Sequence, residues 1–209
     1  MSLIKKDYDK NYYENLLYVE KNDSQRNKYR LKEILKHKTS GTLLEIGCAQ
    51  GGFLKLAKEH FDVEGIDVSE FAVNCAKKDH NVWVGDIQKI KLEENKYDVI
   101  VIFNVLEHLK NPSLAIANIY SALKKGGIVI GSMPNKAGVV GRVFTHIGNY
   151  IDKTHCSTYT PKKWERLFKK EDFNVYFFGE LMASRNNSKY VKGKHWKHFS
   201  FNLMFLCKK

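Results

Sequence analysis

The stretch from Thr42 to Phe53 constrains the fold more than any other part of the chain. A short apolar run that carries one acid, Glu45, breaks into a glycine cluster, and apolar residues then continue at helical spacing. This is the pattern of a strand, a tight turn and a helix. Such a unit presents backbone N–H groups at a helix N-terminus to a ligand, and glycines let the ligand approach the backbone.

The glycine cluster admits two interpretations. Gly47-x-Ala49-x-x-Gly52 is a degraded form of the dinucleotide-binding fingerprint. Glu45-x-Gly47-x-Ala49-x-Gly51 is instead an acid-led pattern with alanine at the middle small position. Asp67 ends the next predicted strand, 62–67, and follows Gly47 by 20 residues. An acid at this distance accepts hydrogen bonds from ribose hydroxyls in either case, so both interpretations predict an adenosine-containing ligand.

The middle of the chain separates these interpretations. An apolar strand over 97–103 continues into Phe103-Asn104-Val105-Leu106-Glu107-His108-Leu109, and a predicted helix over 113–123 is followed by Leu123-Lys124-Lys125-Gly126-Gly127. Together with the acid-led glycine turn, this order of motifs resembles class I S-adenosylmethionine-dependent methyltransferases over residues 40–180. The closest subgroup in pattern contains small-molecule O-methyltransferases of ubiquinone biosynthesis and of glycan tailoring.

The resemblance implies a single α/β domain, a doubly wound and mostly parallel seven-stranded sheet with helices on both faces and a C-terminal antiparallel hairpin. Within it we expect a lead and helix over 1–40, a cofactor-binding core over 41–134, a long substrate-side loop over 135–160, and a helix and hairpin over 161–209. The hairpin would pair strands near 174–178 and 199–207. Thr160 and Pro161 are typical of the start of a helix over 161–170.

The resemblance also implies the cofactor and its site. S-adenosylmethionine would be bound at the carboxyl ends of the strands and leave as S-adenosylhomocysteine. Glu45 would hold the turn and the cofactor amino group, Asp67 the ribose, and Asp86 with Ile87 the adenine. The remaining candidate cofactor-binding residues are Gly47, Cys48, Ala49, Gly51, Phe53, Val68, Asn104 and Val105.

Three residues are candidates for removing a proton from a hydroxyl acceptor. His155 precedes a helix in a segment similar to one in this subgroup, and histidine titrates near neutral pH. His108 and Glu107 are second candidates, although they could instead orient the loop by hydrogen bonds. His195 and His198 have metal-compatible spacing but no third ligand nearby, so we predict no metal.

Composition and charge bear on partners and location. The net charge is +12, and residues 185–209 contain seven Lys and Arg and no acid. This leaves open an RNA-binding or RNA-modifying methyltransferase as the alternative to a small-molecule or glycan acceptor. A nicotinamide-dependent oxidoreductase is disfavoured because Glu180 stands where a Tyr-x-x-x-Lys pair would need lysine. Four scattered cysteines, no apolar run of membrane-spanning length and no signal-peptide pattern predict a cytoplasmic protein. The pattern carries no information on oligomeric state.

Overall fold

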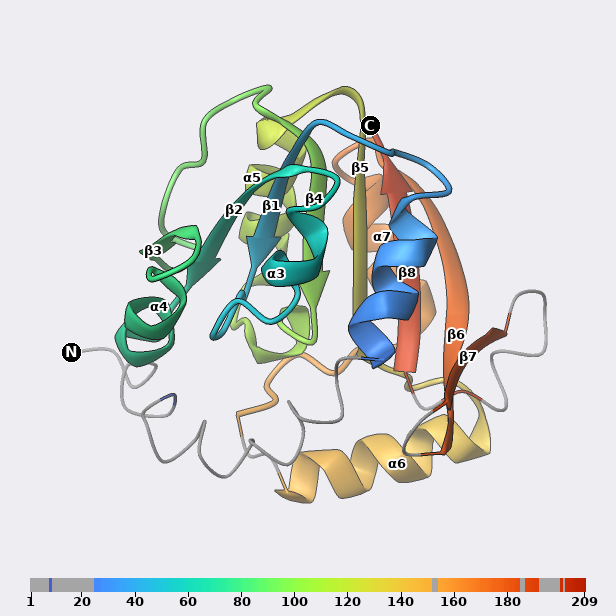
Figure 1. The fold of residues 1–209 in the computed structure, drawn as a ribbon. Coiled ribbons are helices and arrows are strands. Elements are labelled where there is room, and N and C mark those ends of the chain that lie inside the picture. Colours follow the sequence, from blue (N-terminus) through green and yellow to red (C-terminus); the bar gives the residue numbers. More distant parts are fainter. Residues whose placement is uncertain (1–7, 9–24, 152–153, 185–186, 192–199, 201) are drawn as a thin grey trace.

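The computed structural model describes residue 8 and residues 25–151, 154–184, 187–191, 200 and 202–209. One sheet of eight strands organises these residues, in the order β3-β2-β1-β4-β5-β8-β6-β7 (Figure 1). The strands are β1 (Thr42–Ile46), β2 (Asp62–Asp67), β3 (Asn81–Val84), β4 (Tyr97–Phe103), β5 (Leu123–Pro134), β6 (Asn174–Ser184), β7 (Asn187–Val191) and β8 (Asn202–Lys208). The five strands β1 to β5 are parallel, whereas β8 pairs antiparallel with both β5 and β6.

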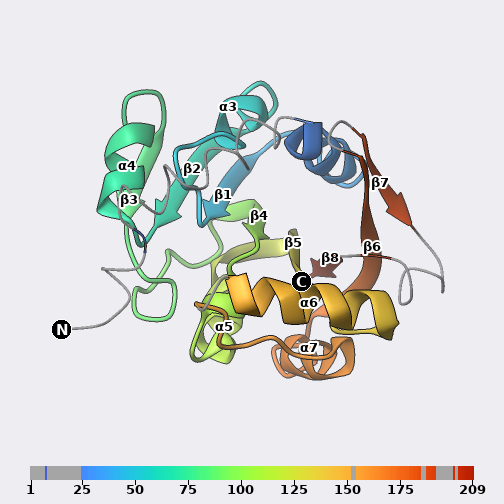
Figure 2. The same ribbon diagram turned by 90° about the horizontal axis from the view of Figure 1, so that it is seen from below.

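The helices cover both faces of this sheet and one of its edges. They are an unlabelled helix over 25–34, α3 (Leu54–Ala57), α4 (Glu70–Ala76), α5 (Pro112–Ala122), α6 (Gly138–Ile151) and α7 (Pro161–Lys169). The helix at 25–34, α3 and α4 lie on one face, and α5 and α7 lie on the other (Figure 2). α6 lies below the ends of β5 and β8 in Figure 1 and therefore in front of them in Figure 2, which is seen from below.

The strand sequences explain why there are two hydrophobic cores. In β4, Val99, Val101 and Phe103 belong to one core, and Ile100 and Ile102 belong to the other. Side chains alternate between the faces of a strand, so a strand that is apolar throughout fills both layers at once. Helices α5 and α7 complete one core with Ile116, Trp164 and Phe168, whereas the helix at 25–34 completes the other with Leu31 and Ile34.

The predicted fold class is confirmed, including the antiparallel pairing of the last two predicted strands. The sheet has one strand more than the seven expected, because β7 pairs with β6 at the sheet edge. Residues 187–191 are largely polar and carry no alternating apolar signal. The connection over 135–160 was expected to be a loop, but α6 occupies 14 residues of it. Among the described residues, no helix is long and apolar enough to cross a bilayer.

Candidate active site

The glycine turn lies where the strand order reverses, between β1 and β4, at the carboxyl edge of the parallel strands. Gly47, Ala49 and Gly51 have φ values of 77°, 46° and 83°. A Cβ on Gly47 would lie 2.3 Å from Cγ2 of Val105, the second residue after β4. Gly47 is therefore required both for its backbone conformation and for this close approach. Parallel α/β sheets bind ligands at such a reversal point.

Asp67 shapes the turn from the end of β2. Its Oδ2 accepts a hydrogen bond from the N–H of Ala49 at 2.9 Å, and its Oδ1 accepts from the N–H of Ser69 at 2.8 Å. The residue is 6% exposed. A carboxylate offers about four lone-pair sites and can accept from several donors at once. Ser69 in turn caps α4, because its hydroxyl accepts from the N–H of Ala72 at 3.2 Å.

Glu45 lies fully inside the protein behind the turn. Its Oε2 has no hydrogen-bond partner among the described residues. Burial raises the pKa of Glu45 well above the usual carboxyl range, and the guanidinium of Arg30 opposes this rise. An acceptor that is buried without a partner is costly, so this atom is suited to a donor that arrives with a ligand.

Arg30 is a candidate site residue that the sequence did not reveal. It is buried, its Cζ lies 4.1 Å from the centroid of the Phe103 ring, and its Nη1 donates to Asn27 at 3.0 Å. Phe53, predicted to contact the cofactor, is buried and packs edge-on against the same ring of Phe103. The helix over 25–34 thus brings a cation to the turn. In the sequence, Arg30 is one basic residue among several on a helix and gives no separate signal.

Four other predicted cofactor-binding residues lie in two places, after β3 and beside the glycine turn. Asp86 and Ile87 follow β3. The Asp86 carboxylate accepts from the N–H of Gln88 and pairs with Lys89, and the side chain of Ile87 is buried in the core. The pKa of Asp86 is lowered: burial opposes the shift, but the bonds from Gln88 and Lys89 outweigh it. Cys48 is buried behind the turn and Val68 is half-buried after β2.

Asn104 follows β4 at the same edge and has a φ of 53°. Its backbone N–H donates to the carbonyl of Ser132 at 2.9 Å, and its Oδ1 accepts from the buried Ser132 hydroxyl at 3.0 Å. Asparagine tolerates the left-handed region better than most residues. The bond to Ser132 fixes the orientation of the Asn104 amide at the edge where the cofactor is expected.

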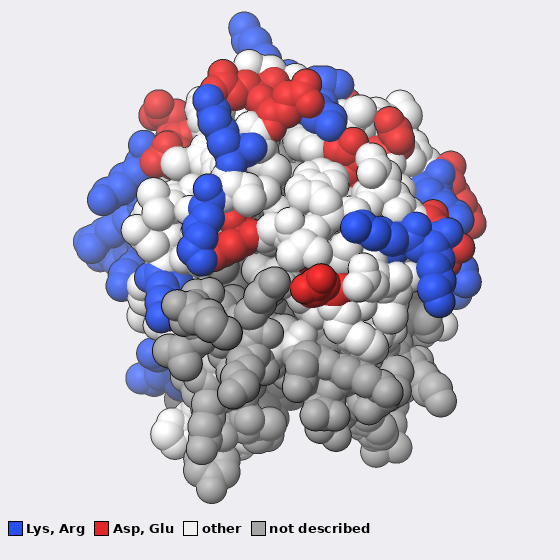
Figure 3. All heavy atoms as spheres, turned by 90° about the vertical axis from the view of Figure 1, so that its left-hand side faces the viewer, with Lys and Arg blue, Asp and Glu red and all other residues white. Residues whose placement is uncertain are grey.

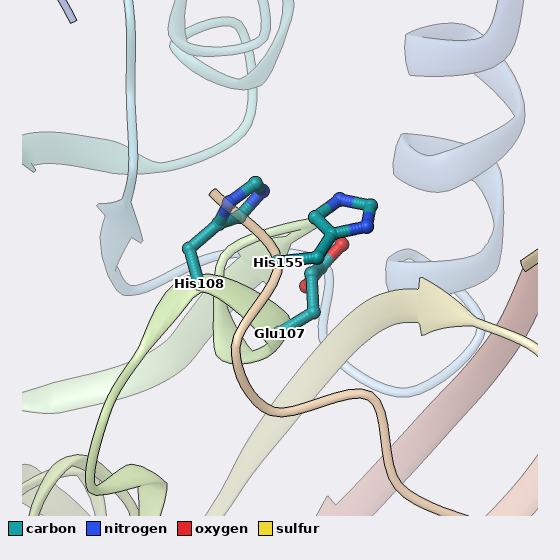
Figure 4. A group of neighbouring side chains, drawn as sticks. All are labelled: Glu107, His108 and His155. Carbon is teal, nitrogen blue, oxygen red and sulfur yellow. The ribbon is translucent and has the colours of Figure 1, made fainter. Parts of the chain in front are cut away.

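Glu107, His108 and His155 come together in space (Figure 4). The first two lie on the 3₁₀ helix η1 (Leu106–His108), and His155 lies after α6. The rings of His108 and His155 have centroids 4.7 Å apart at an angle of 63°. One ligand atom from each of the three residues lies within 4.8 Å of the others.

Backbone bonds hold the two segments of this cluster in register. The N–H groups of Cys156 and Ser157 both donate to the carbonyl of Glu107, at 2.9 and 2.8 Å. The Ser157 hydroxyl donates to the carbonyl of Leu109 at 2.7 Å, and Nδ1 of His108 lies 2.7 Å from Oγ1 of Thr154. Together these bonds place His155 over η1.

This cluster can act on a proton or hold a cation. Two imidazoles beside a carboxylate are suited to proton transfer, and the same atoms are ligands that divalent cations accept. The sequence-based prediction that the protein holds no metal considered His195 and His198, which lie outside the described residues, and stays a prediction. The cluster joins residues 47 positions apart, so sequence spacing could not reveal it.

Tyr8 contacts both the segment after β2 and the cluster of Glu107, His108 and His155. Its carbonyl accepts from the Ser69 hydroxyl at 2.7 Å, and its ring lies edge-on to His108 with centroids 6.1 Å apart. Ser69 follows the acid that shapes the glycine turn, whereas His108 belongs to the cluster. The two parts of the candidate site therefore lie next to each other.

The comparisons with known proteins identify the family. A family model described as a methyltransferase domain matches residues 18–176. The chain belongs to this methyltransferase family. Membership confirms the resemblance to S-adenosylmethionine-dependent methyltransferases expected from the motifs. The comparisons lend no support to the RNA-binding or RNA-modifying alternative. Within the basic segment 185–209, residues 185–186, 192–199 and 201 lie outside the described residues.

Curated relatives of this methyltransferase include ubiquinone biosynthesis O-methyltransferases. The protein from Rickettsia canadensis is 32% identical over 140 residues, which cover 60% of this chain and 58% of that protein. The protein from Coxiella burnetii is 31% identical over 103 residues, which cover 45% and 44%. The chain thus spans about half the length of the curated relatives it matches.

Solved structures show the same fold. A SAM-dependent methyltransferase from Thermotoga maritima, titled a possible histamine N-methyltransferase, has a TM-score of 0.76 at 18% identity over 95% of both chains. A SAM-dependent methyltransferase from Archaeoglobus fulgidus has a TM-score of 0.73 at 21% identity, covering 93% of this chain and 99% of that one. Phosphoethanolamine N-methyltransferase 2 from Haemonchus contortus, solved with S-adenosyl-L-methionine, has a TM-score of 0.63 at 24% identity, covering 73% and 37%.

Proposed function

We propose that this protein transfers a methyl group from S-adenosylmethionine to a hydroxyl of a small molecule. One observation carries the proposal: Val105 packs against Gly47, and the residues that follow Val105 supply Glu107 and His108. A turn suited to the cofactor and a cluster suited to proton removal are therefore neighbours on one edge of the sheet. The ubiquinone biosynthesis relatives favour oxygen as the methyl acceptor atom.

The residues present fit this cofactor. The Oε2 of Glu45, which has no partner in the described part of the chain, would accept from its amino group, and Asp67 would accept from its ribose hydroxyls. Arg30 would face its carboxylate, because the guanidinium lies near Glu45 behind the turn. When bound, the cofactor supplies an electrophilic methyl group on a sulfonium. Residues 41–134 together with Arg30 would hold it, and the acceptor would lie between this core and residues 135–160.

The chain's own task is to place the acceptor and take its proton. Methyl transfer is an in-line displacement, so most of the acceleration comes from orienting the acceptor oxygen. We assign the proton to His155, with His108 and Glu107 stabilising the charge that His155 gains. The ring contact between the two histidines, 4.7 Å between centroids, supports this pairing. A general base contributes about 10²–10⁴-fold.

The first test is calorimetric titration with S-adenosylmethionine, S-adenosylhomocysteine, NADH and NADPH. We expect binding of the two sulfur nucleosides alone, and binding of a nicotinamide nucleotide would refute the proposal. Transfer of labelled methyl to hydroxylated aromatic compounds and sugars would then be measured. We expect His155→Ala to lower the rate by about 10²–10⁴-fold, with the exposed His60→Ala as control. Equal rates in the two variants would remove His155 from the reaction.

The described cysteines Cys48, Cys75, Cys156 and Cys207 are all free thiols. Unpaired cysteines are typical of reducing compartments. They support the cytoplasm as the place where the protein acts, which fluorescence microscopy of a tagged chain would test.

A further inference from the structure

Glu180 is a fully buried acid that belongs neither to the glycine turn nor to the cluster of Glu107, His108 and His155. It lies in the second half of β6, opposite Asn202 of β8, whose Nδ2 donates to its Oε2 at 3.0 Å. Phe178, two residues earlier, packs in the core that the helix over 25–34 completes. Side chains two apart on a strand share one face of the sheet, so Glu180 faces that helix.

The partner of Glu180 on the helix is Arg26. Nε of Arg26 lies 3.5 Å from Oε1 of Glu180, and the two side chains are 14% and 0% exposed. Exposed ion pairs are screened by water and contribute little. Charges of that exposed kind, Lys and Arg interspersed with Asp and Glu, cover the face of the molecule near β3 and α4 (Figure 3). A carboxylate as deeply buried as Glu180 instead needs a cation beside it, so the Arg26–Glu180 pair joins the helix firmly to β6.

Arg30 lies one helical turn after Arg26. Residues four apart share one side of a helix, so both arginines face the sheet. Arg26 reaches β6, whereas Arg30 reaches the end of β4, where its Cζ lies 4.1 Å from the centroid of the Phe103 ring. One side of the helix thus contacts the strand that leads to the cofactor site and a strand of the antiparallel part of the sheet.

The helix is held on both sides of Arg30. Leu31 and Ile34, which follow Arg30, pack in the core. Before Arg30, the Arg26–Glu180 pair joins the helix to β6. The apolar contacts therefore fix the end of the helix, the ion pair fixes its start, and the direction of the Arg30 side chain depends on both.

We propose that Glu180 and Arg26 are positioning residues for cofactor binding, because their ion pair holds the helix over 25–34 so that Arg30 faces the carboxylate of the cofactor. Glu180 is fully buried, so it acts through Arg26 and the helix and not by touching the cofactor. The inference rests on the proposed function, which assigns the cofactor carboxylate to Arg30. The strands β6 and β8 would thereby support a site built on the parallel half of the sheet.

The test compares two ligands by calorimetric titration of the full chain. S-adenosylhomocysteine carries the carboxylate, whereas methylthioadenosine has the same nucleoside and a thioether but no amino acid part. Apparent affinity scales with the fraction of molecules that are competent to bind. If Arg30 faces the site in about a tenth of the molecules once the pair is broken, the affinity for S-adenosylhomocysteine falls about tenfold. The affinity for methylthioadenosine should not change.

The first variants break the ion pair. Glu180→Gln keeps the shape of the side chain and removes its charge, and it should bind S-adenosylhomocysteine about tenfold more weakly. Wild-type affinity for methylthioadenosine would show that this variant is folded. Arg26→Gln should behave in the same way, whereas Arg26→Lys keeps the charge and should retain most of the affinity. Asp98→Asn removes a carboxylate from the ion pair with Lys124 at the opposite edge of the sheet and should change neither affinity.

A double variant tests whether the effect passes through Arg30. Arg30→Gln alone should weaken binding of S-adenosylhomocysteine by about 10- to 100-fold, the range expected for a hydrogen bond between charged groups. Arg30→Gln with Glu180→Gln should bind no more weakly than Arg30→Gln alone, because residues that act through one another are not additive. Losses that add, an equal loss for both ligands, or no loss in Glu180→Gln would overturn the proposal.

The outcome can be separated from that of the proposed function. Hydrogen exchange of the ligand-free protein, measured by mass spectrometry, reports on the helix directly. Amides over 25–34 should exchange faster in Glu180→Gln than in the wild type, and unchanged exchange would overturn the role of the ion pair. Wild-type protein that binds neither S-adenosylhomocysteine nor methylthioadenosine would refute the methyltransferase proposal. Wild-type protein that binds both, with full affinity for S-adenosylhomocysteine retained in Glu180→Gln, would refute the positioning proposal alone.

Discussion

Replacing Asp67 with asparagine tests whether the glycine turn binds a nucleoside. The two carboxylate oxygens accept from the N–H groups of Ala49 and Ser69, at 2.9 and 2.8 Å. In Asp67→Asn one of these oxygens becomes an NH₂ group, which would face a backbone N–H, so one buried donor loses its partner. An unsatisfied buried donor costs about 1–3 kcal/mol, and we expect the free energy of unfolding to fall by this amount.

The loss of cofactor binding should be larger than this change in stability can explain. Hydrogen bonds from ribose hydroxyls to a carboxylate are charge-assisted, and each is worth about 1.5–3 kcal/mol. Losing the charge and one acceptor oxygen should therefore weaken binding of S-adenosylhomocysteine by about 10- to 100-fold. Calorimetric titration gives the affinity, and urea denaturation gives the free energy of unfolding.

Asp98→Asn is the matched control. Asp98 also accepts from a backbone N–H, that of Thr42, and pairs with Lys124 at 2.7 Å, but it lies near the start of β4, at the opposite edge of the sheet. We expect it to lower stability without changing affinity. Unchanged affinity in Asp67→Asn, or an equal loss in both variants, would mean that the nucleoside site is misplaced.

Three further predictions concern the same edge. Gly47→Ala should cost more stability and more cofactor affinity than Gly126→Ala: both glycines have positive φ, but only Gly47 would place a Cβ against Val105. The positive φ alone costs about 1–2 kcal/mol, so equal unfolding curves for the two variants would contradict the close contact. Burial raises the pKa of Glu45, so its stabilising contribution is present below the usual carboxyl pKa and is lost as pH rises through the raised value. Glu45→Gln should therefore gain stability relative to the wild type as the pH rises above the usual carboxyl pKa, and parallel urea curves over that rise would contradict this. Asn104→Gly should keep the backbone conformation at φ 53° but lose the side-chain amide, whereas Asn104→Ala should lose both. We expect the rate of methyl transfer to fall in both variants. A rate that falls only in the alanine variant would mean that only the backbone conformation matters.

The centre of the parallel sheet was predictable because a strand such as β4 is buried on both faces and is therefore apolar almost throughout. β2 and β4 have the expected bounds, 62–67 and 97–103, and the apolar run of β4 ends before a residue that favours turns. Asp67 was found for a related reason: an acid at the end of a strand, at a fixed distance from a glycine turn, occupies a known place in the fold. These signals are local in sequence and need no knowledge of packing.

The features missed by the sequence depend on packing between distant segments. α6 escaped prediction because Gly138 and Gly141 weaken the helical pattern and because Val139, Val143 and Ile147 face outward, so periodicity does not indicate a core. In the sequence, Arg30 has the pattern of a solvent-exposed basic residue on a helix. Its burial follows only from the packing of the helix over 25–34 against Phe103. His155 was a candidate from its segment, but its contact with His108 depends on the backbone bonds to Glu107.

The backbone around Val105 links cofactor binding to proton removal. Val105 occupies the space that a Cβ on Gly47 would need, and the residue before it is held in a left-handed conformation by the carbonyl and hydroxyl of Ser132. Any displacement of the glycine turn would therefore press on the start of η1, which carries Glu107 and His108. Tyr8 contacts His108 on one side and Ser69 on the other, so it would transmit the same displacement from the end of β2. A ligand that orders the turn should thus also order the cluster, and the two halves of the site should respond to the cofactor as one unit.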